Sequence, residues 1–198
     1  MAKLYVIQAG RTVWDEQSRI DSAAGAPLST AGLANVREAA RELADRGIRA
    51  LYAAPGLAEQ QSATAAAEVL GARVRTRKDL RELDYGLWQG LTSDELTRRQ
   101  PKLYRQWLEA PSSVRPPGGE SLQEAADRVG EALRRLLRRR RRGAAAAVLR
   151  PVVFGLVRCM ASAAPLETLW QRVATACTWD VIEADLAAMD KEPARGQG

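Results

Sequence analysis

Residues 3–15 read Lys3-Leu-Tyr-Val-Ile-Gln-Ala-Gly-Arg-Thr-Val-Trp-Asp15, a short apolar run followed by a glycine and then by polar residues. The apolar run over 4–7 predicts a buried strand, and Gly10 predicts a change of direction just after it. In a parallel α/β sheet, ligands bind beyond the carboxyl ends of the strands. The loop after Ile7 is therefore one place where a functional site is expected.

The rest of the chain alternates apolar strand patterns with helical ones. Strands are predicted over residues 4–7, 48–53, 73–77, 144–149 and 178–184. Helices are predicted over residues 29–46, 58–70, 94–109, 121–142 and 152–163. Because helices of this length between strands imply parallel pairing, we expect a three-layer α/β/α sandwich with a mostly parallel central sheet. One domain is expected over residues 1–190, with a flexible C-terminal tail over 191–198.

Composition narrows the class of protein. A chain of 198 residues with 46% hydrophobic residues is long enough to bury a core without metals or disulfides. Cys159 and Cys177 lack the spacing of a zinc or redox motif, so they are interpreted as buried free thiols. No apolar run is long enough to span a bilayer and no secretory signal is recognised, so a cytoplasmic protein without membrane contact is expected.

Positive charge is concentrated near the end of one predicted helix. The net charge is +6, and residues 138–142 are five consecutive arginines that follow Arg134 and Arg135. Cations in a last helical turn favour the helix dipole, which explains part of this run. Five arginines exceed what capping needs, and contact with a polyanion is the alternative interpretation. No nucleic-acid-binding motif accompanies the run.

Six segments, in order along the chain, resemble the histidine phosphatase superfamily, also called phosphoglycerate mutase-like. They are the opening segment at 3–15, Pro-Leu-Ser-Thr-Ala-Gly at 27–32, Tyr-Ala-Ala-Pro-Gly-Leu-Ala-Glu-Gln-Gln-Ser-Ala at 52–63, Leu-Arg-Glu-Leu-Asp-Tyr-Gly-Leu-Trp-Gln-Gly at 80–90, Pro-Pro-Gly-Gly-Glu-Ser at 116–121 and Pro-Leu-Glu-Thr-Leu-Trp at 165–170. The resemblance extends from Lys3 to about Glu183 and implies a phosphoglycerate mutase-like fold.

The resemblance also implies a chemistry that these residues do not support. In the family, one histidine attacks phosphorus, two arginines and a second histidine hold the phosphoryl oxygens, and a glutamate gives a proton to the leaving oxygen. This chain contains no histidine. At the matching positions, Ala9 replaces the nucleophilic histidine, Gln8 and Ala58 replace the two arginines, and Pro151 replaces the second histidine. We therefore expect a pseudoenzyme with no catalytic residues of the family type.

Some residues of the family pattern remain. Glu82 matches the proton-donor glutamate and Tyr85 its neighbouring tyrosine. The other candidates for a ligand pocket are Gly10, Arg11, Thr12 and Arg150, of which the two arginines would supply replacement cations. Without histidine, a Ser-His-Asp or Cys-His site is excluded, and no metal or other cofactor is expected. Asp15, Asp21, Glu82 and Asp84 are carboxylates whose spacing is not diagnostic of a metal site.

Three functions stay open. The first is a noncatalytic binding or regulatory protein that uses a remodelled cleft for a small anionic ligand, or another surface for a protein partner. The second is an enzyme in which Glu82, with Asp84, performs displaced acid/base chemistry on a phosphorylated small molecule held by Arg11 and Arg150. The third is polyanion binding through Arg138–Arg142. Trp170 and Trp179 are candidates for a homodimer surface or for core packing.

Overall fold

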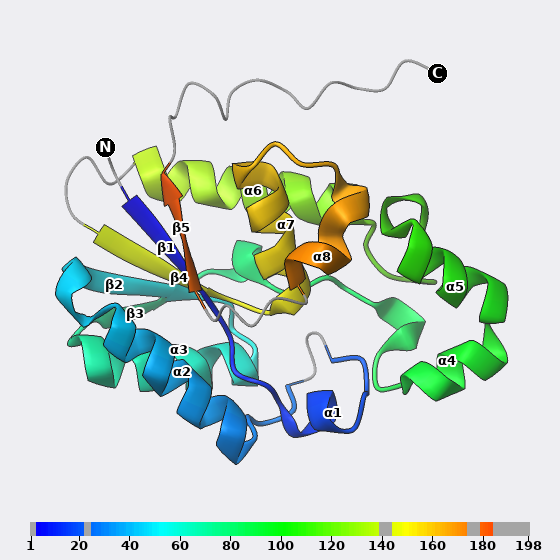
Figure 1. Cartoon of the computed structure of the whole chain (residues 1–198), viewed down its shortest axis with the longest axis horizontal. Coiled ribbons are helices and arrows are strands. Elements are labelled where there is room, and N and C mark those ends of the chain that lie inside the picture. Colours follow the sequence, from blue (N-terminus) through cyan, green and yellow to red (C-terminus); the bar gives the residue numbers. More distant parts are fainter. Residues whose placement is uncertain (1–2, 22–24, 139–143, 174–178, 184–198) are drawn as a thin grey trace.

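A five-stranded sheet forms the centre of the protein. The computed structural model describes residues 3–21, 25–138, 144–173 and 179–183. The strands are β1 (Lys3–Gln8), β2 (Ile48–Ala53), β3 (Arg73–Thr76), β4 (Ala144–Leu149) and β5 (Trp179–Glu183), in the order β3-β2-β4-β1-β5. Every pairing is parallel except that of β5, which runs antiparallel to β1 (Figure 1). The prediction of a mostly parallel sheet is confirmed.

Helices cover both faces of the sheet. They are α1 (Val13–Glu16), α2 (Thr30–Glu42), α3 (Leu57–Leu70), α4 (Ser93–Arg99), α5 (Pro101–Glu109), α6 (Leu122–Arg138), α7 (Pro151–Ala161) and α8 (Leu169–Val173). Short 3-10 turns are η1 (Ala44–Arg46), η2 (Lys78–Leu80), η3 (Gly86–Trp88), η4 (Pro111–Ser113) and η5 (Leu166–Thr168). Figure 1 shows α2 and α3 on one side of the sheet, with α6 and α7 on the other.

The two faces of the sheet build two separate apolar layers. Successive side chains of a strand point to opposite faces, so Val6 packs on the layer that holds α6 and α7, while Ile7 packs on the layer of α2 and α3. Both side chains are fully buried. The central strands β1 and β4 are therefore apolar runs, as strands covered on both faces require, whereas the edge strand β3 is polar and mostly exposed.

A third apolar cluster joins the segment from Leu83 to Val114 to α6, α7 and α8. The rings of Trp88 and Trp107 meet edge to face at a centroid distance of 6.0 Å, and Trp170 packs on Trp107 at 5.2 Å. Trp179, on β5, lies against Tyr5. Trp170 and Trp179, the two candidates for a dimer surface, therefore both pack against aromatic rings of the same chain.

Several predicted boundaries differ from the observed ones. The single helix predicted over 94–109 is two helices, because Pro101 has no N–H for the helix to continue through it. The helix predicted over 29–46 ends at Glu42 and is followed by η1. Residues 139–142, 177 and 184–198 lie outside the described residues, so the arginine run, Cys177 and the C-terminal tail stay predictions, as does the domain boundary at 190.

Candidate functional site

The candidate site lies where β1, β2 and β4 end side by side. Gln8 pairs with Leu149 and Ala53 with Val148, so the residues that follow these strands emerge at one edge of the sheet. Ala9 is buried there and its N–H donates to the carbonyl of Leu149 at 2.8 Å. Pro151 opens α7 directly after β4, and Ala58 is buried in the first turn of α3. These positions carry methyl groups and a pyrrolidine ring, which offer no lone pair for attack on phosphorus.

The turn after β1 depends on close backbone contact with α2. A Cβ added to Gly10 would lie 2.5 Å from the carbonyl oxygen of Gly32, so no larger residue fits without displacement of α2. The N–H of Gly10 donates to Ser62 Oγ at 3.1 Å, which ties this turn to α3. The loop therefore has a fixed path, although Gly10 itself contributes no free donor to a ligand.

Arg150 is the cation at the centre of this site. Its side chain is 2% exposed, and its two terminal nitrogens donate to the Asp15 carboxylate, Nη1 to Oδ2 at 2.9 Å and Nη2 to Oδ1 at 3.0 Å. Nη2 also lies 3.5 Å from Oδ2 of Asp21. Such a two-pronged pair is the strongest arrangement of a guanidinium and a carboxylate. Asp15 and Asp21 thus occupy the face of Arg150 that would otherwise receive an anion.

Asp15 is held in place by a capping box. Thr12 begins α1, and its hydroxyl accepts from the N–H of Asp15 at 3.0 Å, while its own N–H donates to Asp15 Oδ2 at 2.7 Å. Burial alone would raise the pKa of Asp15, but the hydrogen bonds and charge of Arg150 lower it below its usual value. Thr12, predicted as a pocket residue, therefore positions Asp15 toward Arg150.

Glu82 caps the amino end of α7. Its Oε2 accepts from the N–H of Val152 at 2.9 Å, and its Oε1 accepts from the N–H groups of Val153 at 3.1 Å and Leu83 at 2.7 Å. Helix amino ends attract anions through free N–H groups and the helix dipole. Desolvation raises the pKa of Glu82 to about 7, against the opposing charge of Arg150 and the backbone hydrogen bonds. A side chain of the protein already fills the anion position at α7.

Glu59 occupies the corresponding place on α3. It is the third residue of that helix and is 2% exposed. Its Oε2 would lie 2.4 Å from a Cβ added to Gly56, so the carboxylate lies against the start of the helix. Burial raises the pKa of Glu59, and burial likewise raises the pKa of Asp21, with Arg150 opposing both shifts. The sequence interpretation missed Glu59, although an acidic residue in a first helical turn is a recognisable signal.

The other predicted site residues lie apart from this cluster, or contact other groups of the protein instead. Arg11 is exposed and donates to the carbonyl of Asp15 at 3.0 Å. Tyr85 is buried against Trp107, and desolvation raises its pKa well above the usual value, which keeps its hydroxyl neutral. Asp84 is exposed and accepts from the N–H of Gly86. The structure thus brings Glu82 and Arg150 together, while Arg11 and Asp84 remain at the surface.

The site contains more acidic groups than basic ones. Around the one guanidinium of Arg150 lie four carboxyl groups that interact with it electrostatically, those of Asp15, Asp21, Glu59 and Glu82. Within the described part of the chain, Asp21 Oδ1, Arg150 Nε and Gln8 Oε1 are buried without a hydrogen-bond partner. No group of three or more carboxylates or thiols among the described residues has the arrangement of a metal site. The site is an internally paired network with an excess of acid.

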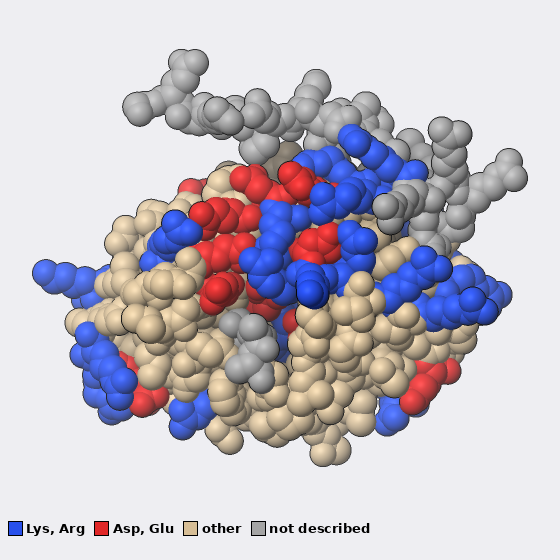
Figure 2. All heavy atoms as spheres, turned by 180° about the vertical axis from the view of Figure 1, so that it is seen from behind, with Lys and Arg blue, Asp and Glu red and all other residues tan. Residues whose placement is uncertain are grey.

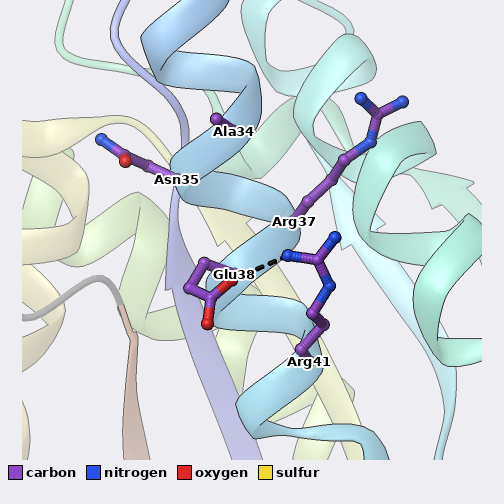
Figure 3. Close-up of a pocket in the computed structure, with 5 residues that line it drawn as sticks. All are labelled: Ala34, Asn35, Arg37, Glu38 and Arg41. Carbon is purple, nitrogen blue, oxygen red and sulfur yellow. Dashed lines mark hydrogen bonds and ion pairs between the residues drawn. The ribbon is translucent and has the colours of Figure 1, made fainter.

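A shallow depression elsewhere on the surface does not resemble a binding site. Figure 3 shows it on the outer side of α2, lined by Ala34, Asn35, Arg37, Glu38 and Arg41. Arg41 pairs with Glu38 at 2.7 Å on the same helix. All five residues come from α2, and Arg37 also pairs with Glu68 of α3 at 3.6 Å, so the depression is a shallow, charge-paired part of a helix surface.

The chain is similar to proteins of one superfamily. A family model described as "Histidine phosphatase superfamily (branch 1)" matches residues 4–189. The chain is 36% identical over 136 residues to "Bifunctional protein Rv2228c" of Mycobacterium tuberculosis, across 68% of this chain and 37% of that protein. It therefore spans little more than a third of that relative. It is 24% identical to "Phosphoserine phosphatase 1" of Hydrogenobacter thermophilus, over 93% of this chain and 88% of the relative.

Solved structures share the fold. "Bacillus stearothermophilus YhfR" superposes with a TM-score of 0.82 at 23% identity, over 86% of this chain and 84% of that one. A mycobacterial glucosyl-3-phosphoglycerate phosphatase, Rv2419c, in complex with VO3 gives a TM-score of 0.80 at 21% identity, over 90% of each chain. No helix within the described ranges is both long and apolar enough to cross a membrane.

Proposed function

Since the chain belongs to the histidine phosphatase superfamily, branch 1, we propose that it is a member without phosphoryl-transfer activity that acts as a binding or regulatory protein. The observation that carries the proposal is the internal pairing of the site: Asp15 takes the guanidinium of Arg150, and Glu82 takes the amino end of α7. The guanidinium of Arg150 and the N–H groups of α7 are both suited to bind a phosphate, and carboxylates of the chain already bind them.

The missing nucleophile supports the same conclusion. The chain has no histidine, and the position after β1 that the family pattern gives to the nucleophile is Ala9. Ser62, which lies close to this turn, accepts a hydrogen bond from Gly10 and has no imidazole to activate its hydroxyl. A covalent phosphoryl intermediate of the family type therefore has no atom on which to form.

Electrostatics also oppose phosphate binding at this site. A phosphate dianion would have to displace Asp15 from Arg150 and approach the carboxylates of Glu59 and Glu82. At an effective dielectric constant of about 20, two unit charges about 4 Å apart interact by about 4 kcal/mol. Asp15, whose lowered pKa keeps it ionised at neutral pH, would repel the dianion on at least this scale, so we expect the site to reject phosphate.

The alternative of displaced acid/base chemistry rests on Glu82. A carboxylic acid with a pKa of about 7 is half protonated at neutral pH, as a general acid should be. Both of its oxygens, however, already accept backbone N–H groups, and Arg150 is paired rather than open to a substrate. Glu82 is better explained as a cap of α7.

Phosphate release by the purified full chain tests the proposal. The substrates are p-nitrophenyl phosphate, phosphoserine and 3-phosphoglycerate, and the Glu82→Gln variant is assayed beside the unaltered chain. We expect no release above background from either protein. Turnover that Glu82→Gln abolishes would replace the proposal with the displaced-chemistry alternative, and turnover that survives the change would show a nucleophile not recognised at this site.

Thermal unfolding with added phosphate provides a second measurement. A ligand that binds only the folded state raises the melting temperature, by an amount that grows with the logarithm of the ligand concentration relative to Kd. We expect inorganic phosphate to leave the melting temperature unchanged relative to a chloride control of equal ionic strength. A rise that Arg150→Lys removes would show that an anion competes successfully with Asp15.

A further inference from the structure

A surface rich in arginine lies along the β3 edge of the sheet. Arg73 and Arg75 stand in register with Ala50 and Tyr52 of β2, whose side chains are buried in the apolar layer of α6. Residues in register in a parallel pair share a face. Arg73 and Arg75 therefore project from the edge strand on the side of the sheet that α6 covers, and both are exposed.

The end of α6 adds Arg135 to the same surface. Arg135 donates to Asp79 at 3.0 Å, and Asp79 also pairs with Arg77 at 2.6 Å. One carboxylate thus joins α6 to the segment that follows β3. Figure 2 shows Lys and Arg side chains gathered on this rear face of the molecule, with Asp and Glu among them.

Two segments at this edge of the protein are mostly basic. We define the basic face as residues 73–79 and 131–138. It holds seven cations, Arg73, Arg75, Arg77, Lys78, Arg134, Arg135 and Arg138, and two carboxylates, Asp79 and Glu131. Both carboxylates pair with Arg135. Among the described residues, no ion pair engages Arg73, Arg75 or Lys78. The basic face therefore has a net charge of +5.

We infer that the basic face binds the phosphate backbone of double-stranded nucleic acid without sequence preference. Guanidinium groups match phosphate oxygens in two-pronged geometry, and six of the seven cations are arginines. Neither segment of the basic face contains an aromatic residue on which an unpaired base could stack. Binding through phosphates alone explains this composition, and a duplex presents phosphates without exposed base faces.

This inference is independent of the proposed function. Arg150 and Glu82 lie at the carboxyl end of β4, whereas the basic face lies along the edge strand β3. Detection of phosphatase activity would refute the proposed function but not duplex binding, and absence of duplex binding would not bear on the proposed function.

Fluorescence anisotropy of the full chain with a labelled DNA duplex of mixed sequence, over a range of salt concentrations, tests the inference. The variant is Arg73→Gln/Arg75→Gln. The matched control is Arg98→Gln/Arg105→Gln, which removes the same charge from exposed positions on α4 and α5. Each lost phosphate contact reduces the slope of log K against log salt by about 0.9. We expect the variant slope to fall by about 1.8 and its affinity to fall about 60-fold at about 0.1 M salt, with the control close to the unaltered chain.

Five outcomes would overturn the inference. They are absence of duplex binding, unchanged affinity in the Arg73/Arg75 variant, equal loss in both double variants, tighter binding of a single strand than of the duplex, and equally tight binding of polyglutamate, which would indicate an acidic protein partner. Circular dichroism of each variant checks that the fold is retained.

Discussion

Replacement of Glu82 by glutamine should remove a large pH dependence from the stability of this protein. The carboxyl group of Glu82 is 4% exposed, and its pKa is raised from 4.5 to about 7, first by desolvation. A raised carboxyl pKa means that the folded state holds the proton more tightly than the unfolded state. The stabilising contribution is therefore complete below about pH 4.5 and is lost as the pH rises through about 7.

The magnitude follows from the two pKa values. A difference of about 2.5 pKa units corresponds to about 3.4 kcal/mol over the whole range, of which about 2.5 kcal/mol falls between about pH 5 and about pH 8. Glutamine cannot ionise. On going from the lower to the higher pH, Glu82→Gln should therefore gain about 2.5 kcal/mol of unfolding free energy relative to the unaltered chain.

Urea unfolding at the two pH values measures this difference directly. Glu16→Gln, at an exposed position of α1, is the matched control and should show no comparable change. Subtraction of the unaltered chain cancels the titration of Asp21 and Glu59, whose pKa values are also raised. A constant difference between Glu82→Gln and the unaltered chain across the range would refute the reasoning, because it would mean that the N–H groups of α7 and the charge of Arg150 fully offset desolvation.

Three further changes test the packing of the site and the core. Arg150→Met leaves Asp15 without its buried partner and should destabilise the fold by about 3–5 kcal/mol in urea unfolding; a change below about 1 kcal/mol would show that the ion pair is dispensable. Gly32→Ala places a Cβ 2.2 Å from the carbonyl oxygen of Arg11 and should lower the melting temperature, and an unchanged melting temperature would contradict the close contact. Leu133→Ala, at a core position that is 1% exposed, should destabilise by about 2–5 kcal/mol, whereas Leu87→Ala, at a position 73% exposed, should have little effect; equal effects would argue against the apolar layer under α6.

β2 and β4 could be predicted from the sequence because they are buried on both faces. The run of alanines and aliphatic residues at 144–149 is β4 with the same boundaries, and 48–53 is β2. Local periodicity was less reliable where a proline interrupts it, as between α4 and α5. The direction of β5 was not predicted strand by strand, because the apolar pattern of a strand is the same for both directions.

The site could be predicted only in part. The resemblance to the family placed Ala9, Glu82, Arg150 and Pro151 near one another, and the parallel register of β1 and β4 agrees with that placement. The sequence does not show which side chains form hydrogen bonds or ion pairs with each other. Asp15 and Arg150 are 135 residues apart, and the pairing depends on the capping box that orients Asp15. Arg150 therefore lies at the predicted place, but as a neutralised group rather than an open cation.

The position of β1 has a consequence for how the chain is made. Within the sheet, β1 is synthesised first, yet its two neighbours are β4 and β5, which begin at Ala144 and Trp179. β2 and β3 pair with each other across a short stretch of sequence, but β1 has no hydrogen-bonding partner in the sheet until β4 has been synthesised. Contacts this distant in sequence slow folding, and they leave an apolar strand exposed in the meantime. A nascent chain stalled before β4 would therefore display residues 4–7 unpaired, and would be a natural substrate for chaperones that bind short apolar segments.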